Sequence, residues 1–295
     1  MKKILFLGIA LILIIGCATQ NVDKDAGTST ANPSRGIKIE ALGLEDYREI
    51  SSGERVPWSF RITNNMPDPT EVHITFNDGV GSEYGGIGIL ETRKTIPGIL
   101  KEDETINQKN YLDLDLSEAE YHIPKDRFTE SETPAEESFA ITAELDYDVY
   151  FTGVYRTCVG SLDVCSKKEG LASTSGSHTD TYPISISRIE RRFLTYGSNP
   201  RIIFDIYFAE YNGDSTEKEI NNIAIDMSGT TINCNSNKIK YSSLKENKVE
   251  CSGSMPSVEE GFYTKEITVS FNYNYKFTTI FDSIIIIPVA PEVYS

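Results

Sequence analysis

The feature of the sequence that most restricts its fold is a repeated segment of alternating apolar and polar residues. "ITAELDYDVYFTGVY", starting at Ile141, and "ITVSFNYNYKFTTIF", starting at Ile267, share five residues at a constant offset of 126 (267 − 141). In both copies the odd-numbered positions are mainly apolar or aromatic and the even-numbered positions mostly polar. A period of two indicates a strand with one buried face and one wet face. The repeat therefore predicts two copies of one β-structure.

A weaker match aligns "WSFRITNN", starting at Trp58, with "IIFDIYFAEYNG", starting at Ile202, at an offset of 144 (204 − 60, from Phe60 to Phe204). The first copy thus carries 18 extra residues (144 − 126), and an acidic segment lies among them. Turn clusters such as "NNMPDP", "NDGVG" and "YNGD" separate the strands, which favours antiparallel sheets packed face to face. We expect an all-β protein of two tandem antiparallel β-sandwich domains, residues 37–197 with the acidic insertion and residues 198–295.

The N-terminus has the three-part layout of a secretory signal. Lys2 and Lys3 precede an apolar run from Ile4 to Ile15, and Gly16 follows. A membrane-spanning helix needs about 20 apolar residues, so this run is too short to remain as an anchor. We expect residues 1–16 to be a signal peptide that is removed.

The end of that run, "IIGC", resembles the lipobox of exported lipoproteins. The resemblance implies that Cys17 becomes the new N-terminus and carries a diacylglyceryl group, which would hold the protein to the membrane. An ordinary signal peptide cut after Gly16 or Ala18 is the alternative. The small and polar residues that follow predict a flexible tether over 17–36, with a stretched reach of about 60 Å.

Two further stretches resemble surface-protein modules. "SSGERVPWSFRITNN" is similar to the second strand of immunoglobulin-like modules of archaeal and bacterial surface proteins. "DYDVYFTGVYRTCVGSLDVC" resembles a stretch of uncharacterised archaeal envelope proteins. The resemblance implies immunoglobulin-like sandwiches, although the antibody-type Cys…Trp…Cys spacing is absent because Trp58 lies 100 residues before Cys158.

Four cysteines remain after Cys17, and exported proteins meet conditions in which disulfides persist. Pairing Cys158 with Cys165 and Cys234 with Cys251 keeps each bridge within one domain and closes the shortest loops. The competing interpretation is a zinc site in which His178 joins Cys158 and Cys165, but the spacings are wider than zinc sites usually have. No histidine lies near a cysteine in sequence to support a thiol nucleophile.

The net charge restricts the possible partners. Removal of Lys2 and Lys3 leaves 26 basic residues (28 − 2) against 44 acidic ones, a mature net charge of −18 (26 − 44). Nucleic acid and anionic lipid surfaces are therefore disfavoured as direct partners. Solubility, cation binding or a basic protein partner agree with this charge.

Nine of the carboxylates lie within residues 113–137. This segment is usually a solvated face or loop, but we take it as the candidate binding loop because rigid sandwiches carry recognition in their loops. Asp113 and Asp115 point the same way on a strand and offer oxygen ligands to calcium, although without EF-hand spacing. The candidate binding residues are Asp113, Asp115, Glu130, Glu132, Glu136 and Glu137, within a set of loops that also includes 79–88 and 158–180.

Catalytic motifs are weak. The three histidines, His73, His122 and His178, are spread along the chain, and no G-x-S-x-G segment is present. "NDGVGSEYGGIG" lacks the third glycine and the Lys-Ser or Lys-Thr of a phosphate loop. Most tyrosines fall on the buried parity, and Tyr150 and Tyr211 are the exposed exceptions. We expect no enzymatic activity, no cofactor and no metal site, with calcium the one cation kept open.

The sequence thus predicts a lipid-anchored protein of the cell membrane, on the extracellular or periplasmic side. We expect it to act as a binding or structural module of the envelope, such as in adhesion, with an envelope or surface protein as its partner. Two alternatives remain: a solute-binding lipoprotein of a transporter, and a cell-surface hydrolase.

Overall fold

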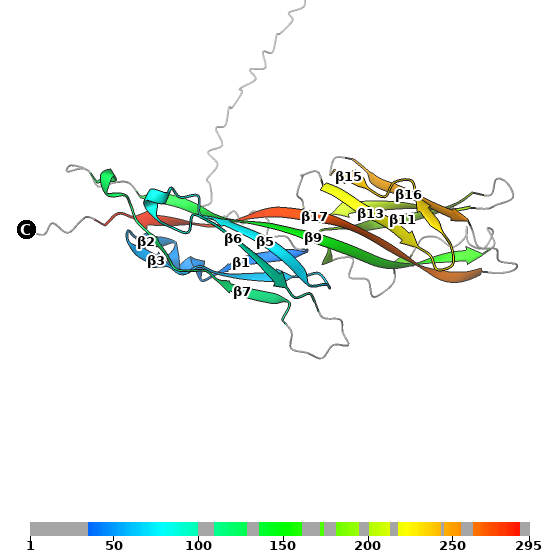
Figure 1. Cartoon of the computed structure of the whole chain (residues 1–295), viewed down its shortest axis with the longest axis horizontal. Helices are drawn as coiled ribbons and strands as arrows, with labels where there is room; N and C mark the ends of the chain where they lie inside the picture. The colour runs from blue at the N-terminus through cyan, green and yellow to red at the C-terminus, as the bar shows by residue number, and fades with distance from the viewer. Residues whose placement is uncertain are drawn as a thin grey trace, which may run out of the picture.

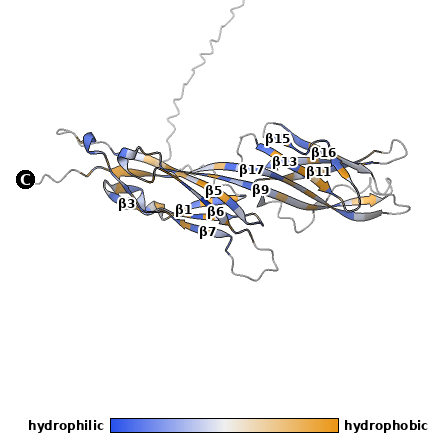
Figure 2. Ribbon diagram, in the orientation of Figure 1, coloured by the Kyte–Doolittle hydropathy of each residue, from blue (hydrophilic) through white to orange (hydrophobic). Residues whose placement is uncertain are grey.

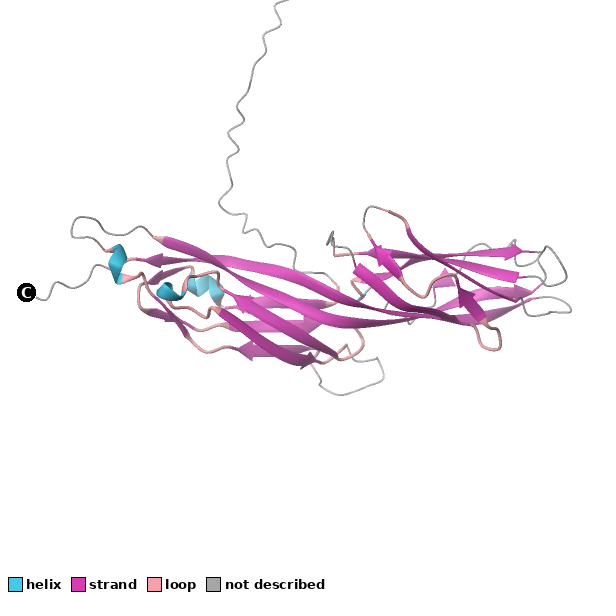
Figure 3. Ribbon diagram, turned by 45° about the horizontal axis from the view of Figure 1, so that its top comes forward, coloured by secondary structure: helices cyan, strands magenta, loops and turns pink. Residues whose placement is uncertain are grey.

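The computed structural model describes residues 35–99, 109–128, 136–160, 172–173, 181–194, 201–212, 218–242, 245–254 and 262–289. These residues fold almost entirely into strands of antiparallel sheets (Figures 1 and 3), which confirms the predicted all-β sandwich fold. The predicted signal peptide and Cys17 lie outside the described residues. Within them, no helix is long and apolar enough to cross a membrane.

In chain order the elements are β1 (Ile37–Leu42), η1 (Leu44–Tyr47), β2 (Glu49–Ser51), β3 (Glu54–Val56), β4 (Ser59–Asn64), β5 (Thr70–Asn77), η2 (Ser82–Tyr84), β6 (Ile89–Ile96), β7 (Tyr111–Asp115), β8 (Ala119–Tyr121), η3 (Lys125–Arg127), β9 (Glu137–Gly160), β10 (Ala172–Ser173), β11 (Ile184–Leu194), β12 (Arg201–Glu210), β13 (Lys218–Asp226), β14 (Ile232–Cys234), β15 (Ile239–Tyr241), β16 (Asn247–Ser254) and β17 (Phe262–Ile287).

The strands form two halves with the same order. In the first half the sheet β1-β4-β7 faces the strands β6-β5-β9, and in the second half the sheet β11-β12-β16 faces β15-β13-β17. Aromatic side chains join the facing sheets, because the rings of Phe60 and Phe76 lie 4.5 Å apart in the first half and those of Phe208 and Phe271 5.1 Å apart in the second. The sequence repeat is therefore a repeat of strand order.

Two long strands connect the halves (Figure 1). β9 has 24 residues and β17 has 26, and they pair antiparallel over nearly their whole length. Asp148 pairs with Asn274, which is also its equivalent in the repeat (148 + 126 = 274). The two halves are consequently related by a pseudo-two-fold axis through this pair. We call the region around Asp148 and Asn274, midway along both strands, the waist.

The sheets do not divide at residue 198. β11 precedes that position but pairs with β12 along its length, so the second half of the strand pattern begins at Ile184. β9 and β17, assigned by the sequence to different domains, share one sheet. The physical reason is that a strand can form backbone hydrogen bonds with any strand that lies beside it, including one from the other copy of the repeat. Two separately folding domains stay a prediction.

The core follows the predicted alternation, which is visible as alternating bands along the strands in Figure 2. The odd-numbered side chains of β9 from Ile141 to Phe151 are 2% exposed or less, and their equivalents from Ile267 to Tyr275 are 3% exposed or less. Phe277, the last of the second series, is half-buried and packs against this core. The opposite prediction for Tyr150 and Tyr211 is also confirmed, since they are 67% and 40% exposed.

Candidate functional site

The predicted acidic residues of β7 bind neighbouring strand residues. Arg61 on β4 forms an ion pair with Asp113, with Nε and Oδ1 2.8 Å apart, and this hydrogen bond holds the pKa of the Asp113 carboxyl below its ordinary value. The Ser59 hydroxyl donates to Asp115 at 2.7 Å. Both carboxylates point to the same side, as the strand parity predicts, but each has a protein partner. In the described part of the chain, no group of three or more His, Cys, Asp or Glu side chains is placed to hold a metal ion.

The loop over residues 79–88 is built around the buried Asp78. Its Oδ2 accepts hydrogen bonds from the backbone N–H of Ile87 at 2.7 Å and from the hydroxyl of Tyr121 at 3.2 Å. Gly86 has a φ of 84°, and a Cβ there would lie 2.3 Å from the same Oδ2, so only glycine fits this close approach. The predicted loop over 79–88 is thus a shaped turn.

That loop meets part of the acidic segment at one end of the molecule. Gly85 forms a β-bridge with Tyr121, and the Tyr84 hydroxyl donates to Glu137 at 3.1 Å. Glu136 is exposed beside it, whereas Glu130 and Glu132 lie outside the described residues. A groove of about 640 Å³ opens at this end, lined among others by His122, Lys125, Phe128 and Val289.

The third predicted loop begins at the other end of the molecule. Cys158 stands 21 residues after Glu137 along β9, a distance of about 70 Å at 3.3 Å per residue. The loops over 79–88 and 113–137 therefore share an end, and the loop over 158–180 starts far from them. Cys158 is disulfide-bonded. Its predicted partner Cys165, and His178, lie outside the described residues.

The second predicted disulfide is confirmed. Cys234 of β14 and Cys251 of β16 are directly paired across the two strands and joined through their sulfur atoms. Cys251 is completely buried, so the bridge connects the edge strand β14 to the core of the second half.

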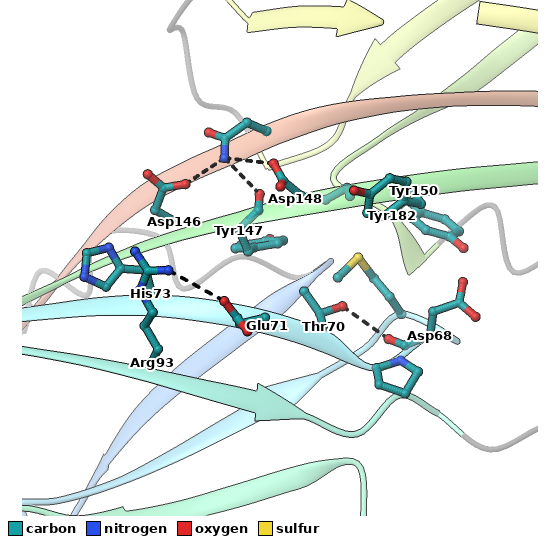
Figure 4. Close-up of a pocket in the computed structure, with 14 residues that line it drawn as sticks. Asp68, Thr70, Glu71, His73, Arg93, Asp146, Tyr147, Asp148, Tyr150 and Tyr182 are labelled. Atoms are coloured by element: carbon teal, nitrogen blue, oxygen red, sulfur yellow. Dashed lines mark hydrogen bonds and ion pairs between the residues drawn. The ribbon is translucent and has the colours of Figure 1, made fainter. Parts of the chain in front are cut away.

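A polar cleft of about 370 Å³ lies at the waist (Figure 4). β5 begins at Thr70, whereas its neighbour β9 and the next strand β17 extend beyond that point. The cleft opens next to this first residue of β5, where β9 no longer has β5 at its side. Asp68 lies two residues before β5, Glu71 lies at its start, and Asp146 and Asp148 come from β9. Sequence reasoning did not select these four carboxylates.

Hydrogen bonds within the cleft are concentrated on one amide. Asn274 Nδ2 donates to Asp146 Oδ1 at 2.7 Å and to Asp148 Oδ1 at 3.3 Å. On the neighbouring strands, Arg93 lies 3.8 Å from Glu71. The cleft thus contains more carboxylates than cations.

One of the three histidines considered in the sequence analysis, His73, lines this cleft. It is a strand residue of β5, paired directly with Asp146 of β9, and its Nε2 lies 3.6 Å from Glu91 Oε2. His122 lines the groove at the end of the molecule, so the structure does not bring these two histidines together.

Comparisons with known proteins add no relative that informs this site. No family model matches the sequence, and the comparison with curated proteins finds no match. Among solved structures, a chain described as "Escherichia coli alpha-2-macroglobulin activated by porcine elastase" aligns at 11% identity over 88% of this chain and 22% of that chain, with a TM-score of 0.19. A likeness this weak carries no argument about fold or function.

Proposed function

We propose that the protein is a lipid-anchored cell-surface protein that acts as a non-catalytic binding or structural module of the envelope. The observation that carries this proposal is the pair of long strands. At 3.3 Å per residue, the 26 residues of β17 extend about 85 Å, and β9 accompanies them across both halves. A body supported by two continuous, paired strands is suited to holding surfaces apart and presenting them to partners.

The start of the described chain supports attachment at the middle of this body. The Arg35 guanidinium lies 3.6 Å from the centre of the Tyr211 ring, and the Arg35 carbonyl accepts a hydrogen bond from Asn212. The next residue, Gly36, donates its N–H to the carbonyl of Thr181. A lipid on Cys17 would therefore hold the body near its waist and leave both ends accessible.

The test is replacement of Cys17 by serine. We expect the Cys17→Ser variant to move from the membrane to the soluble fraction or to stall in processing, because the lipid supplies the attachment. Ala18→Ser, which keeps the cysteine, is the matched control and should stay in the membrane. Retention of Cys17→Ser in the membrane after a carbonate wash would contradict the anchor. Crosslinking of neighbours on intact cells would then identify the partner.

The all-β fold of the described residues does not favour the solute-binding alternative, because solute-binding proteins of the common kind have α/β lobes. The hydrolase alternative is favoured by one observation, the position of His73 beside Asp146 and Glu91 in the waist cleft. A histidine next to carboxylates can act as a general base. Hydrolysis of nitrophenyl esters or glycosides that is lost in His73→Ala and kept in His122→Ala would support this second function.

A further inference from the structure

The repeat provides an internal comparison at the waist. Asp146 and Asp148 of β9 are equivalent to Asn272 and Asn274 of β17, since each pair differs by 126 positions. All four lie on the outward face of the same sheet, and the strands pair in register through them. Aspartate and asparagine have nearly the same shape, so the asparagines show that this strand architecture does not require the carboxylate charge. The negative charges on β9 are therefore not needed for the strand structure at these positions.

Among the described residues, the added charge has no ion-pair partner. Asp146 and Asp148 each accept a hydrogen bond from the neutral side-chain amide of Asn274. Neither of these two carboxylates forms an ion pair with a described residue. Two neighbouring cations form ion pairs with other carboxylates: Arg93 lies against Glu71, and Lys276, which is paired opposite Asp146 in the strand register, has its Nζ 2.6 Å from Glu144. Asp68 brings a third carboxylate without an ion pair in the described part of the chain.

Two tyrosines complete the cleft. Tyr182 is 4% exposed and lines the cleft, yet its hydroxyl makes no hydrogen bond with any described residue. Burial and the nearby Asp68 carboxylate raise the pKa of this hydroxyl, so it remains protonated and can bind a polar ligand group. Tyr150, 67% exposed, presents a ring next to Asp148 on the same face of β9. The Tyr182 side chain is almost wholly buried against Phe151, and its hydroxyl lies at the wall of a cleft large enough for a ligand.

These features select the chemistry of the ligand. Carboxylates beside an exposed aromatic ring favour an organic cation, because the ring face attracts the same positive charge. A divalent metal is disfavoured, since the described residues contain no group of three suitable ligands close enough to hold one. A volume of about 370 Å³ accommodates one long side chain with water.

We propose that the waist cleft binds the lysine or arginine side chain of a basic segment of a partner protein, with Asp68, Asp146 and Asp148 as the anionic groups, Tyr150 as the ring and the Tyr182 hydroxyl as a hydrogen-bonding group. This inference rests on the proposed function as a binding module and names the chemistry of its partner. It places recognition at the middle of the molecule, in addition to the end loops.

The test is calorimetric titration of the full chain in mild detergent with a lysine decapeptide at low salt. The double variant Asp146→Asn and Asp148→Asn should bind about tenfold more weakly, because two charges facing the ligand are lost. Its fold should be kept, since β17 already carries asparagine at the equivalent positions. The matched control, Glu118→Gln with Asp226→Asn, removes the same number of exposed charges outside the cleft and should change affinity less than twofold.

Tyr182→Phe should also weaken binding severalfold, which general charge attraction does not predict. Equal losses in the two double variants, or no loss in either, would overturn the proposal. So would spermine binding as tightly as the decapeptide with the same dependence on Asp146 and Asp148, because the ligand would then be a free polyamine. The titration takes place in solution, so failure of the lipid anchor in Cys17→Ser leaves its outcome unchanged.

Discussion

Two buried tyrosines at equivalent positions of the repeat, Tyr147 and Tyr273, connect the facing sheets and allow a quantitative test of the fold. The Tyr147 hydroxyl accepts a hydrogen bond from the backbone N–H of Ile37, at the start of β1, at 3.2 Å. The Tyr273 hydroxyl accepts from the N–H of Ile184, at the start of β11, at 2.9 Å and donates to the carbonyl of the same residue at 3.0 Å. Both side chains are 2% exposed.

Replacement by phenylalanine removes only the hydroxyl. Tyr147→Phe leaves one buried N–H without this partner and should lower the free energy of unfolding by about 1–2 kcal/mol. Tyr273→Phe leaves both an N–H and a carbonyl without this partner, so we expect about 2–3 kcal/mol. Tyr150→Phe is the control, because that side chain is exposed and should change stability by less than about 0.5 kcal/mol.

Urea unfolding followed by tryptophan fluorescence and by circular dichroism measures these differences. The single Trp58 reports on the first half, and circular dichroism reports on both. Because β9 and β17 belong to both halves, we expect the two signals to change in one transition, and each variant to shift that transition as a whole. A larger effect of Tyr147→Phe than of Tyr273→Phe would refute the hydrogen-bond reasoning. Separate transitions, with Tyr273→Phe leaving the Trp58 transition unchanged, would refute the cooperative unit.

Two further predictions concern the second half. Replacing Cys234 and Cys251 together by alanine should lower stability, measured by urea unfolding, by about 3 kcal/mol, as expected for a bridge with a sequence separation of 17. Asp205 is buried, which opposes its ionisation, but the hydrogen bond and charge of Arg192 and the charge of Lys248 outweigh burial and lower its pKa. Since the folded pKa lies below the unfolded value of about 3.8, this stabilisation is present above that pH and lost as the pH falls through the folded pKa. The stability difference between the unmodified protein and Asp205→Asn should therefore shrink as the pH is lowered from 5 to 2, and a difference independent of pH would contradict the assignment.

The sequence by itself determined that the two repeated segments are strands and which of their faces is buried. A strand places alternate side chains on opposite faces, so the local pattern from Ile141 to Phe151 was sufficient to predict burial, and the same parity identified Tyr150 and Tyr211 as exposed. Pairing within short loops was sufficient for the bridge between Cys234 and Cys251. The repeat was visible as well, because it is a property of the residues alone.

Only the tertiary structure decided which strands are neighbours. Local alternation does not specify a pairing partner, so nothing in the sequence indicates that β9 pairs with its own equivalent β17 and carries one sheet through both halves. The waist cleft has the same origin. Asp68 and Glu71 precede Asp146 and Asp148 by more than seventy positions, and they line one cleft because β5 lies beside β9 and begins at Thr70, next to the middle of β9. Comparing "DYD" at Asp146 with "NYN" at Asn272 would have pointed to the two carboxylates, but the surface they share depends on contacts between distant segments, which form only when the sheets assemble.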